Sequence, residues 1–130
     1  MFNFVGAKIC DIGLTVSMDN THISRADGGD GGSPRYMAPE LFDPDQKITE
    51  KVDIWSLGCI LVEIFGGQVP YADCQNMQQL VTKIIVLRER PAVPSFLPLD
   101  AQQVVKECFH FDSVLRITAS KLWAAMQNPQ

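Results

Sequence analysis

Four short groups of residues carry side chains whose types and order could do chemistry. Asp11-Ile12-Gly13 follows an apolar run, and residues 32–40 read Gly-Ser-Pro-Arg-Tyr-Met-Ala-Pro-Glu. Residues 53–58 read Asp-Ile-Trp-Ser-Leu-Gly inside an apolar segment, and Arg116 stands near the end. Carboxylate oxygens are the ligands that magnesium prefers. Asp11 could therefore hold a divalent metal, although the tripeptide by itself indicates only a turn that ends a strand.

These groups, taken in order, resemble the second half of a eukaryotic protein kinase domain. Asp-Ile-Gly stands where that family has Asp-Phe-Gly, and Ala-Pro-Glu stands where its activation segment ends. Residues 53–58, Pro70-Tyr71 and Arg116 follow in the family's order, so the resemblance runs from about Ala7 to Trp123. Residues 32–40 resemble a serine/threonine kinase of the tyrosine-kinase-like group.

The resemblance implies transfer of a phosphoryl group from ATP to protein hydroxyl groups, with Mg²⁺ bridging the β- and γ-phosphates. Asp11 matches the carboxylate that holds this magnesium, and Gly13 gives the segment backbone freedom. ATP and Mg²⁺ are thus the expected cofactors, with Asp11 and Gly13 as their binding residues in an incomplete site. Ile12 departs from the usual phenylalanine and lacks the aromatic packing that helps to set active and inactive positions.

Residues 14–37 match the activation loop. A phosphate adds ~1.5 to 2 negative charges and can order a loop through an arginine. The candidate phosphorylation sites are Thr15, Ser17, Thr21 and Ser24, although for any one of them an unmodified polar loop residue is the simpler interpretation. Ser33 resembles the residue that aligns the substrate hydroxyl near the catalytic base, while Ser33-Pro34 could instead form only a turn.

The resemblance also implies structural roles for five residues. Glu40 and Arg116 resemble the family's buried ion pair, since a planar guanidinium can donate two hydrogen bonds to one carboxylate. Asp53 resembles the acid that accepts backbone N–H groups of the catalytic loop; the alternative is an acid that only interacts with the helix dipole. Trp55 and Gly58 are expected to pack in the core.

The family's catalytic loop should precede the magnesium motif, yet the residues before Asp11 contain no histidine, arginine or other aspartate. The Gly-rich loop and the ATP-anchoring lysine have no match either. We therefore expect one partial kinase domain at residues 1–130, with the activation segment at 11–40, a helical C-lobe at 41–127, and no N-lobe or catalytic loop. Such a chain should be catalytically incompetent alone; the alternative is a non-catalytic interaction or scaffold module.

Composition limits the partners and the compartment. A formal net charge of −4 and a pI of about 5.0 argue against a nucleic-acid surface. No apolar stretch reaches the ~20 residues of a membrane-spanning helix, and the start does not resemble a signal peptide. The four cysteines fit no zinc spacing, so reduced thiols in a cytoplasmic protein are expected. The expected partners are a protein substrate and another kinase or regulatory protein, with no nucleic acid and no membrane.

These groups must be positioned by a mainly α fold with one short β fragment at residues 4–10. The strongest helix is predicted at residues 50–65, with Thr49 as N-cap and Gly66-Gly67 at its end. Apolar residues cover nearly every face of this helix, which predicts that it is central and buried on all sides. One helical turn at residues 38–42 should stop at Pro44.

Three further helices are predicted from apolar spacing. Residues 76–87 should turn Met77, Leu80, Ile84 and Leu87 inward. Residues 101–109, capped by Asp100, should bury Val104, Val105 and Cys108, and residues 119–126, capped by Thr118, should bury Leu122, Trp123 and Met126. Pro91, Pro94 and Pro98 predict an extended connection between the first two of these helices.

Overall fold

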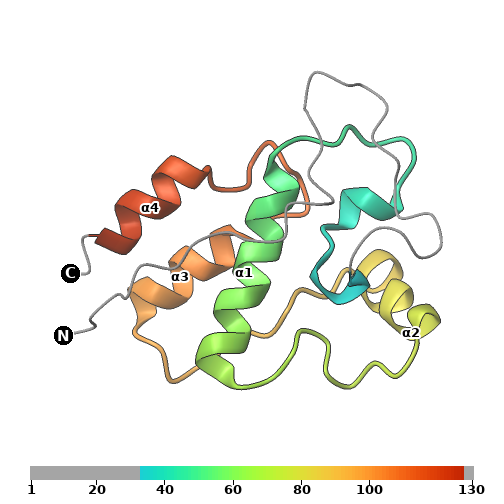
Figure 1. Cartoon of the computed structure of the whole chain (residues 1–130), viewed down its shortest axis with the longest axis horizontal. Helices are drawn as coiled ribbons and strands as arrows, with labels where there is room; N and C mark the ends of the chain where they lie inside the picture. Colours follow the sequence, from blue (N-terminus) through green and yellow to red (C-terminus); the bar gives the residue numbers. More distant parts are fainter. Residues whose placement is uncertain (1–32, 128–130) are drawn as a thin grey trace.

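The computed structural model describes residues 33–127, so the predicted strand at residues 4–10 lies outside the described residues. Within 33–127 the chain is helical and contains no strand, which confirms the mainly α fold. The elements are η2 (Pro34–Tyr36), η3 (Pro39–Phe42), α1 (Lys51–Gly66), α2 (Met77–Val81), η4 (Thr82–Val86), α3 (Leu99–Glu107) and α4 (Ala119–Gln127). Figure 1 shows α1 in the middle, with α3 and α4 to one side of it and η2, η3 and α2 to the other.

Helix α1 begins and ends close to the predicted residues. The N-cap is Glu50, which makes no side-chain cap bond, so the predicted cap at Thr49 is wrong by one residue; the Thr49 hydroxyl oxygen still accepts a hydrogen bond from the Lys51 backbone N–H at 3.2 Å. At the other end Gly67 takes a left-handed conformation with φ 73° and donates its N–H to the Glu63 carbonyl at 2.8 Å. A left-handed glycine of this kind is a common helix terminator.

The main hydrophobic core lies between α1, α3 and α4. Trp55 of α1 is 0% exposed, and its ring meets those of Phe109 and Phe111 edge to face, at centroid distances of 5.2 and 5.5 Å. Such aromatic pairs add stability beyond the burial of their area. The other buried members of the cluster are Ala38, Ile54, Cys59, Val62, Val105, Cys108 and Leu122.

The prediction that α1 is buried on all sides is wrong. Leu57, Ile60 and Ile64 are 38%, 44% and 69% exposed and lie along one side of the helix. The segments that contact α1 within residues 33–127 pack against its other sides, so an apolar stripe remains exposed to solvent. Residue types alone show how much apolar surface a helix has, but not how much of it its neighbours cover.

The helix predicted at residues 76–87 is divided into α2 and a π-helical turn, η4. Asn76 caps it, accepting the Gln79 N–H at 2.9 Å, and Leu80 and Ile84 are buried as expected. Leu87, predicted to face inward, is 58% exposed, because a π turn advances less per residue than the 3.6-residue period assumes. Met77, also predicted to face inward, is 45% exposed at the first residue of α2, so this prediction is wrong as well.

Helices α3 and α4 lie close to their predicted residues, but only one of their two predicted N-caps is found. Pro98 occupies the N-cap of α3 and Asp100 lies inside the first turn, so the predicted cap at Asp100 is wrong. A proline suits this position because it has no N–H to leave unpaired. Thr118 does cap α4, accepting the Lys121 N–H at 3.2 Å.

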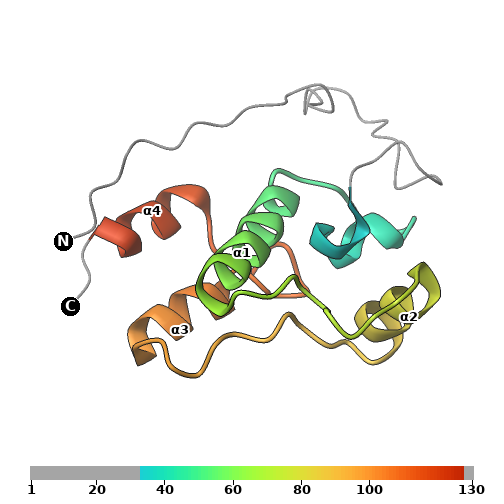
Figure 2. The ribbon, with the colours of Figure 1, turned by 60° about the horizontal axis from the view of Figure 1, so that its bottom comes forward.

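Only one of the three residues predicted to face inward from α4 does so. Leu122 is buried, whereas Trp123 and Met126 are 65% and 44% exposed, which contradicts their predicted burial. Helix α4, which lies at one end of the described part in Figure 2, contributes only Leu122 to the buried core cluster. Among the helices described, none is both long and apolar enough to span a membrane.

The buried thiols of Cys59 and Cys108 should make this core less stable at alkaline pH. Burial raises the pKa of Cys59 to about 12 and that of Cys108 to about 11, from a reference of 9.0. Because the folded state favours the neutral thiol, this contribution is complete below pH 9 and is lost as pH rises toward the folded pKa values. We expect the urea midpoint to fall as pH rises from about 9 to 11, which tryptophan fluorescence would measure.

The control for the alkaline effect is Cys59→Ala, which removes one ionisable group and leaves the tyrosines unchanged. Its urea midpoint should fall less steeply with pH than that of the wild-type chain. Identical slopes for the two proteins would contradict the assignment of the effect to Cys59.

Candidate functional site

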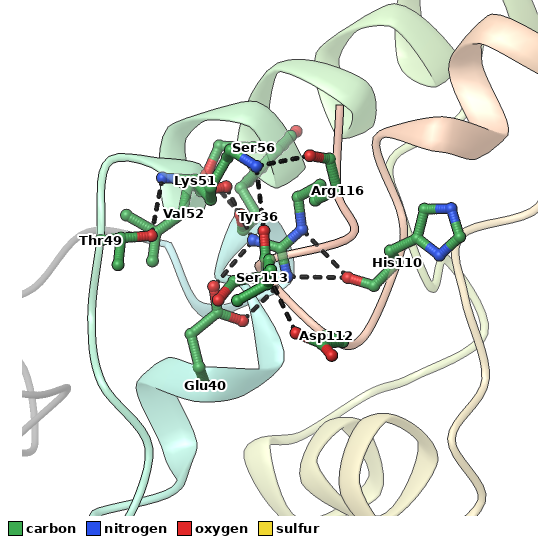
Figure 3. A network of polar contacts seen from close by, with 11 residues as sticks. Tyr36, Glu40, Thr49, Lys51, Val52, Ser56, His110, Asp112, Ser113 and Arg116 are labelled. Atoms are coloured by element: carbon green, nitrogen blue, oxygen red, sulfur yellow. Dashed lines mark hydrogen bonds and ion pairs between the residues drawn. The ribbon is translucent and has the colours of Figure 1, made fainter. Parts of the chain in front are cut away.

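A buried ion pair fastens the segment Ser33–Phe42 to the helical body (Figure 3). The Arg116 Nη1 and Nη2 atoms donate to the two Glu40 carboxylate oxygens at 2.7 and 2.9 Å. Both side chains are 0% exposed. This two-bonded geometry is the strongest that an arginine and a carboxylate can make.

The Arg116 guanidinium uses every donor that it has. Nε and Nη2 donate to the His110 carbonyl at 3.0 and 2.9 Å, and Nη1 donates to the Lys51 carbonyl at 2.7 Å in addition to its bond with Glu40. A guanidinium carries five N–H groups, so none is left unpaired. A buried charge is tolerated when it is neutralised and fully hydrogen-bonded, and both conditions are met here.

A second arginine anchors the same segment to the loop after α1. Arg35 donates to the backbone carbonyls of Pro70, Tyr71 and Cys74 at 3.2, 2.5 and 2.6 Å. Tyr71 takes a left-handed conformation with φ 53°, which is uncommon for a residue other than glycine. Its hydroxyl donates to the Glu89 carbonyl at 2.9 Å and its side chain is buried, so Tyr71 is a packing residue.

A third attachment joins the segment to α1 itself. The Tyr36 hydroxyl donates to Glu63 Oε2 at 2.7 Å, and this bond, together with burial, raises the pKa of Tyr36. The Ser56 hydroxyl donates to the Tyr36 carbonyl at 2.7 Å. Ser33–Phe42, called the ledge below, is thus attached to α1, to the Pro70–Cys74 loop and to the Arg116 region; Ser33 is exposed, whereas residues 37–40 are buried.

The structure places the remaining candidate site residues in different surroundings. Ser33 is exposed just before η2, and its hydroxyl makes no hydrogen bond within the described part of the chain. Asp53 is exposed in the first turn of α1, and its carboxylate has no partner among residues 33–127. Trp55 and Gly58 are buried at the contact of α1 with α3. Outside the described residues lie Asp11, Ile12, Gly13, Thr15, Ser17, Thr21 and Ser24.

Between residues 33 and 127 there is no group of three or more histidine, cysteine, aspartate or glutamate side chains that could hold a metal ion. Cys59, Cys74 and Cys108 are free thiols. What the described residues provide is a fixed ledge with one exposed hydroxyl at its start. A surface of this kind can bind and orient a peptide segment.

Comparisons with known proteins agree with this arrangement. The family model described as "Protein kinase domain" matches residues 3–126. The chain belongs to the protein kinase domain family. The fold and the order of motifs that the residues indicated are therefore those of a eukaryotic protein kinase.

Several relatives of this kinase-domain chain are named as mitogen-activated protein kinase kinases or kinase kinase kinases. It is 32% identical over 125 residues to mitogen-activated protein kinase kinase kinase 20 of Arabidopsis thaliana, covering 94% of this chain and 36% of the relative. It is 34% identical over 121 residues to dual specificity mitogen-activated protein kinase kinase 7 of Homo sapiens, covering 88% and 28%. The Schizosaccharomyces pombe MAP kinase kinase kinase mkh1 is 33% identical, with 11% of its length covered. The chain thus spans about a third of the first two relatives.

Sequence reasoning missed several residues that hold the ledge of this kinase-domain chain. Arg35, Tyr36, Lys51 and Glu63 each make a long-range hydrogen bond, and none was singled out beforehand. Only Arg35 and Tyr36 carried a signal, because they lie inside the distinctive run at residues 32–40. Lys51 and Glu63 are ordinary charged residues on a helix, and nothing in their spacing indicates a distant partner.

Proposed function

We propose that this chain supplies the substrate-side part of a protein serine/threonine kinase, which transfers the γ-phosphoryl group of ATP to hydroxyl groups of protein substrates. The observation that carries the proposal is the fully satisfied Glu40–Arg116 pair, which fixes the end of the activation segment. Phosphoryl transfer depends mainly on positioning and on charge stabilisation. The ledge is attached at three places and can therefore provide the positioning.

Ser33 is the proposed substrate-alignment residue. Its side chain is exposed where the ledge begins, and its hydroxyl has no acceptor or donor within residues 33–127 that would hold it elsewhere. Pro34 and the anchored Arg35 follow directly, so the backbone at Ser33 is fixed on its C-terminal side. These features suit a hydroxyl that hydrogen-bonds an incoming substrate side chain.

ATP and Mg²⁺ are the proposed cofactors. When bound, the metal would supply positive charge to the β- and γ-phosphates during transfer. Asp11 is the proposed metal ligand and Gly13 its flexible neighbour, on the basis of the family's motif. The names of the relatives support a further step: the protein substrate is itself a protein kinase in a cascade.

We also propose that these 130 residues transfer no phosphate alone, since they contain no His-Arg-Asp tripeptide to supply the catalytic base. Purified chain, radiolabelled ATP, Mg²⁺ and casein should give no incorporation above that of an Asp11→Asn variant. Incorporation that requires ATP and disappears in Asp11→Asn would overturn this part of the proposal.

A chimera tests the kinase function itself. The part of the human relative that precedes its magnesium motif would be joined to residues 11–130 of this chain. We expect ATP-dependent phosphorylation of casein that is lost in Asp11→Asn and reduced in Ser33→Ala. A folded chimera that binds ATP yet transfers no phosphate would count against the proposed function.

A further inference from the structure

A hollow of about 480 Å³ lies between η3 and the turn η4, away from the exposed Ser33 hydroxyl. Its apolar lining comes from Pro39, Phe42, Pro44, Ile84, Ile85 and Phe111. Its rim carries Arg88 together with Asp43 and Asp112. The hollow therefore offers an apolar floor with charged groups around its mouth, which is typical of sites that bind a side chain of another molecule.

Two arginines approach the ring of Phe111: Arg88, which lines this hollow, and Arg90, which lines a separate hollow beside Pro94 and Phe96. The Arg88 and Arg90 guanidinium carbons lie 4.4 and 5.4 Å from the centroid of the Phe111 ring. The ring face attracts each cation, but two like charges on one ring repel each other. Neither guanidinium has an ion pair or a hydrogen bond with any residue between 33 and 127.

The backbone is strained where it presents Arg88. Arg88 has φ 52°, in the left-handed region that side chains rarely adopt. The π turn holds it there, with the Leu87 and Glu89 N–H groups bonded to the Thr82 and Lys83 carbonyls at 3.0 and 2.9 Å. Left-handed non-glycine residues and π turns are both concentrated at functional sites.

The acids near the rim are engaged in local structure. Asp112 accepts the Val114 N–H at 2.9 Å, and Asp43 accepts the Asp45 N–H at 3.0 Å and the Gln46 amide at 3.1 Å. The Glu89 carboxylate lies 3.4 Å from the Lys83 ammonium group. Asp43 and Asp112 keep their negative charge in the lining of the hollow, but neither they nor Glu89 forms an ion pair with Arg88 or Arg90 in the described part.

We propose that this hollow and the two arginines at the Phe111 ring, Arg88 and Arg90, bind an acidic peptide segment of a partner protein. Carboxylates of the segment would accept hydrogen bonds from Arg88 and Arg90, and a neighbouring apolar side chain would enter the hollow over Ile84 and Ile85. A peptide fits better than a small anion because apolar surface continues beside the arginines, at Val86 (70% exposed) and Leu87 (58% exposed). This surface does not depend on the kinase function proposed above.

Fluorescence anisotropy of the full 130-residue chain with a fluorescein-labelled peptide, Glu-Asp-Leu-Phe-Glu-Asp, tests the proposal. We expect saturable binding that weakens as salt rises. A peptide with Gln and Asn in place of Glu and Asp should bind roughly tenfold or more weakly, as for the loss of an interface hot spot. This comparison changes only the peptide, so it holds even if a protein variant fails to fold.

The protein-side variants are Arg88→Gln with Arg90→Gln, and the matched control is Lys106→Gln with Lys121→Gln, which removes the same charge from α3 and α4. The first pair should lose roughly tenfold or more in affinity, while the control should keep most of it. Amide shifts on peptide addition should cluster at residues 84–90 and 111. Absence of saturable binding, equal losses in both pairs, or attachment to anionic vesicles but not to the peptide would overturn the proposal.

Discussion

Replacing Arg116 by methionine should lower the free energy of unfolding by about 3–5 kcal/mol, because it leaves the buried Glu40 carboxylate without its counter-charge. The His110 and Lys51 carbonyls would lose donors at the same time. A domain of this size has a total stability of about 5–15 kcal/mol, so the variant should be close to unfolded. Urea unfolding followed by tryptophan fluorescence would measure the change.

A double-mutant cycle distinguishes the cost of leaving one charge unpaired from the contribution of the pair itself. Glu40→Gln should also be strongly destabilising, but Glu40→Leu combined with Arg116→Met should cost less than the sum of the two single changes, because no unpaired charge then remains buried. Lys83→Met is the control, since Lys83 pairs with Asp73 at the surface and its loss should hardly move the midpoint. An Arg116→Met midpoint equal to that of Lys83→Met would refute the role given to the pair.

Gly58→Ala should be the second strongly destabilising change, by roughly 1–3 kcal/mol, as for other overpacked cores. A Cβ atom on Gly58 would lie 2.7 Å from the Cys108 Cβ and 2.9 Å from the Phe109 ring. Such distances essentially never occur between real Cβ atoms, so α1 and α3 would have to separate. The separation would loosen the aromatic cluster around Trp55, which the urea midpoint and the tryptophan emission maximum would both report.

The same helix provides the control for Gly58→Ala. Gly66→Ala adds the same methyl group to α1, and the nearest atom it would meet is Pro94 Cγ at 3.1 Å, at the end of a ring that can shift slightly. We expect its midpoint to stay near that of the wild-type chain. If Gly58→Ala proved as stable as Gly66→Ala, the close approach of α1 to α3 would not be the reason for a glycine at position 58.

The positions of the helices followed from the sequence because their ends carry local signals. Gly67 and Thr118 end or cap helices, and Thr49 bonds the first residue of α1, in each case through residues within four positions, so their effect is visible in the order of residues. The inward face was harder to predict. Trp123 and Leu87 are as apolar as Leu122, and their exposure depends on neighbours far away in the chain and on a π turn that no residue type specifies.

In the candidate site, too, some residues could be predicted from the sequence and others could not. Glu40 and Arg116 were named from the family's motif, and the structure brings them together across 76 residues. Arg35 was not named, although its three bonds to backbone carbonyls hold the same ledge. A carbonyl acceptor belongs to every residue, so a contact of this type leaves no pattern in the sequence.

The long separation of Glu40 from Arg116 also affects synthesis. Ribosomes add roughly 5–20 residues per second, so the glutamate leaves the peptidyl-transferase centre roughly 4–15 s before its arginine has been made. An unpaired carboxylate is far too costly to dehydrate during that interval. The Glu40 carboxylate therefore stays hydrated on the nascent chain until Arg116 has been made, and residues 33–42 cannot reach their final packing before then.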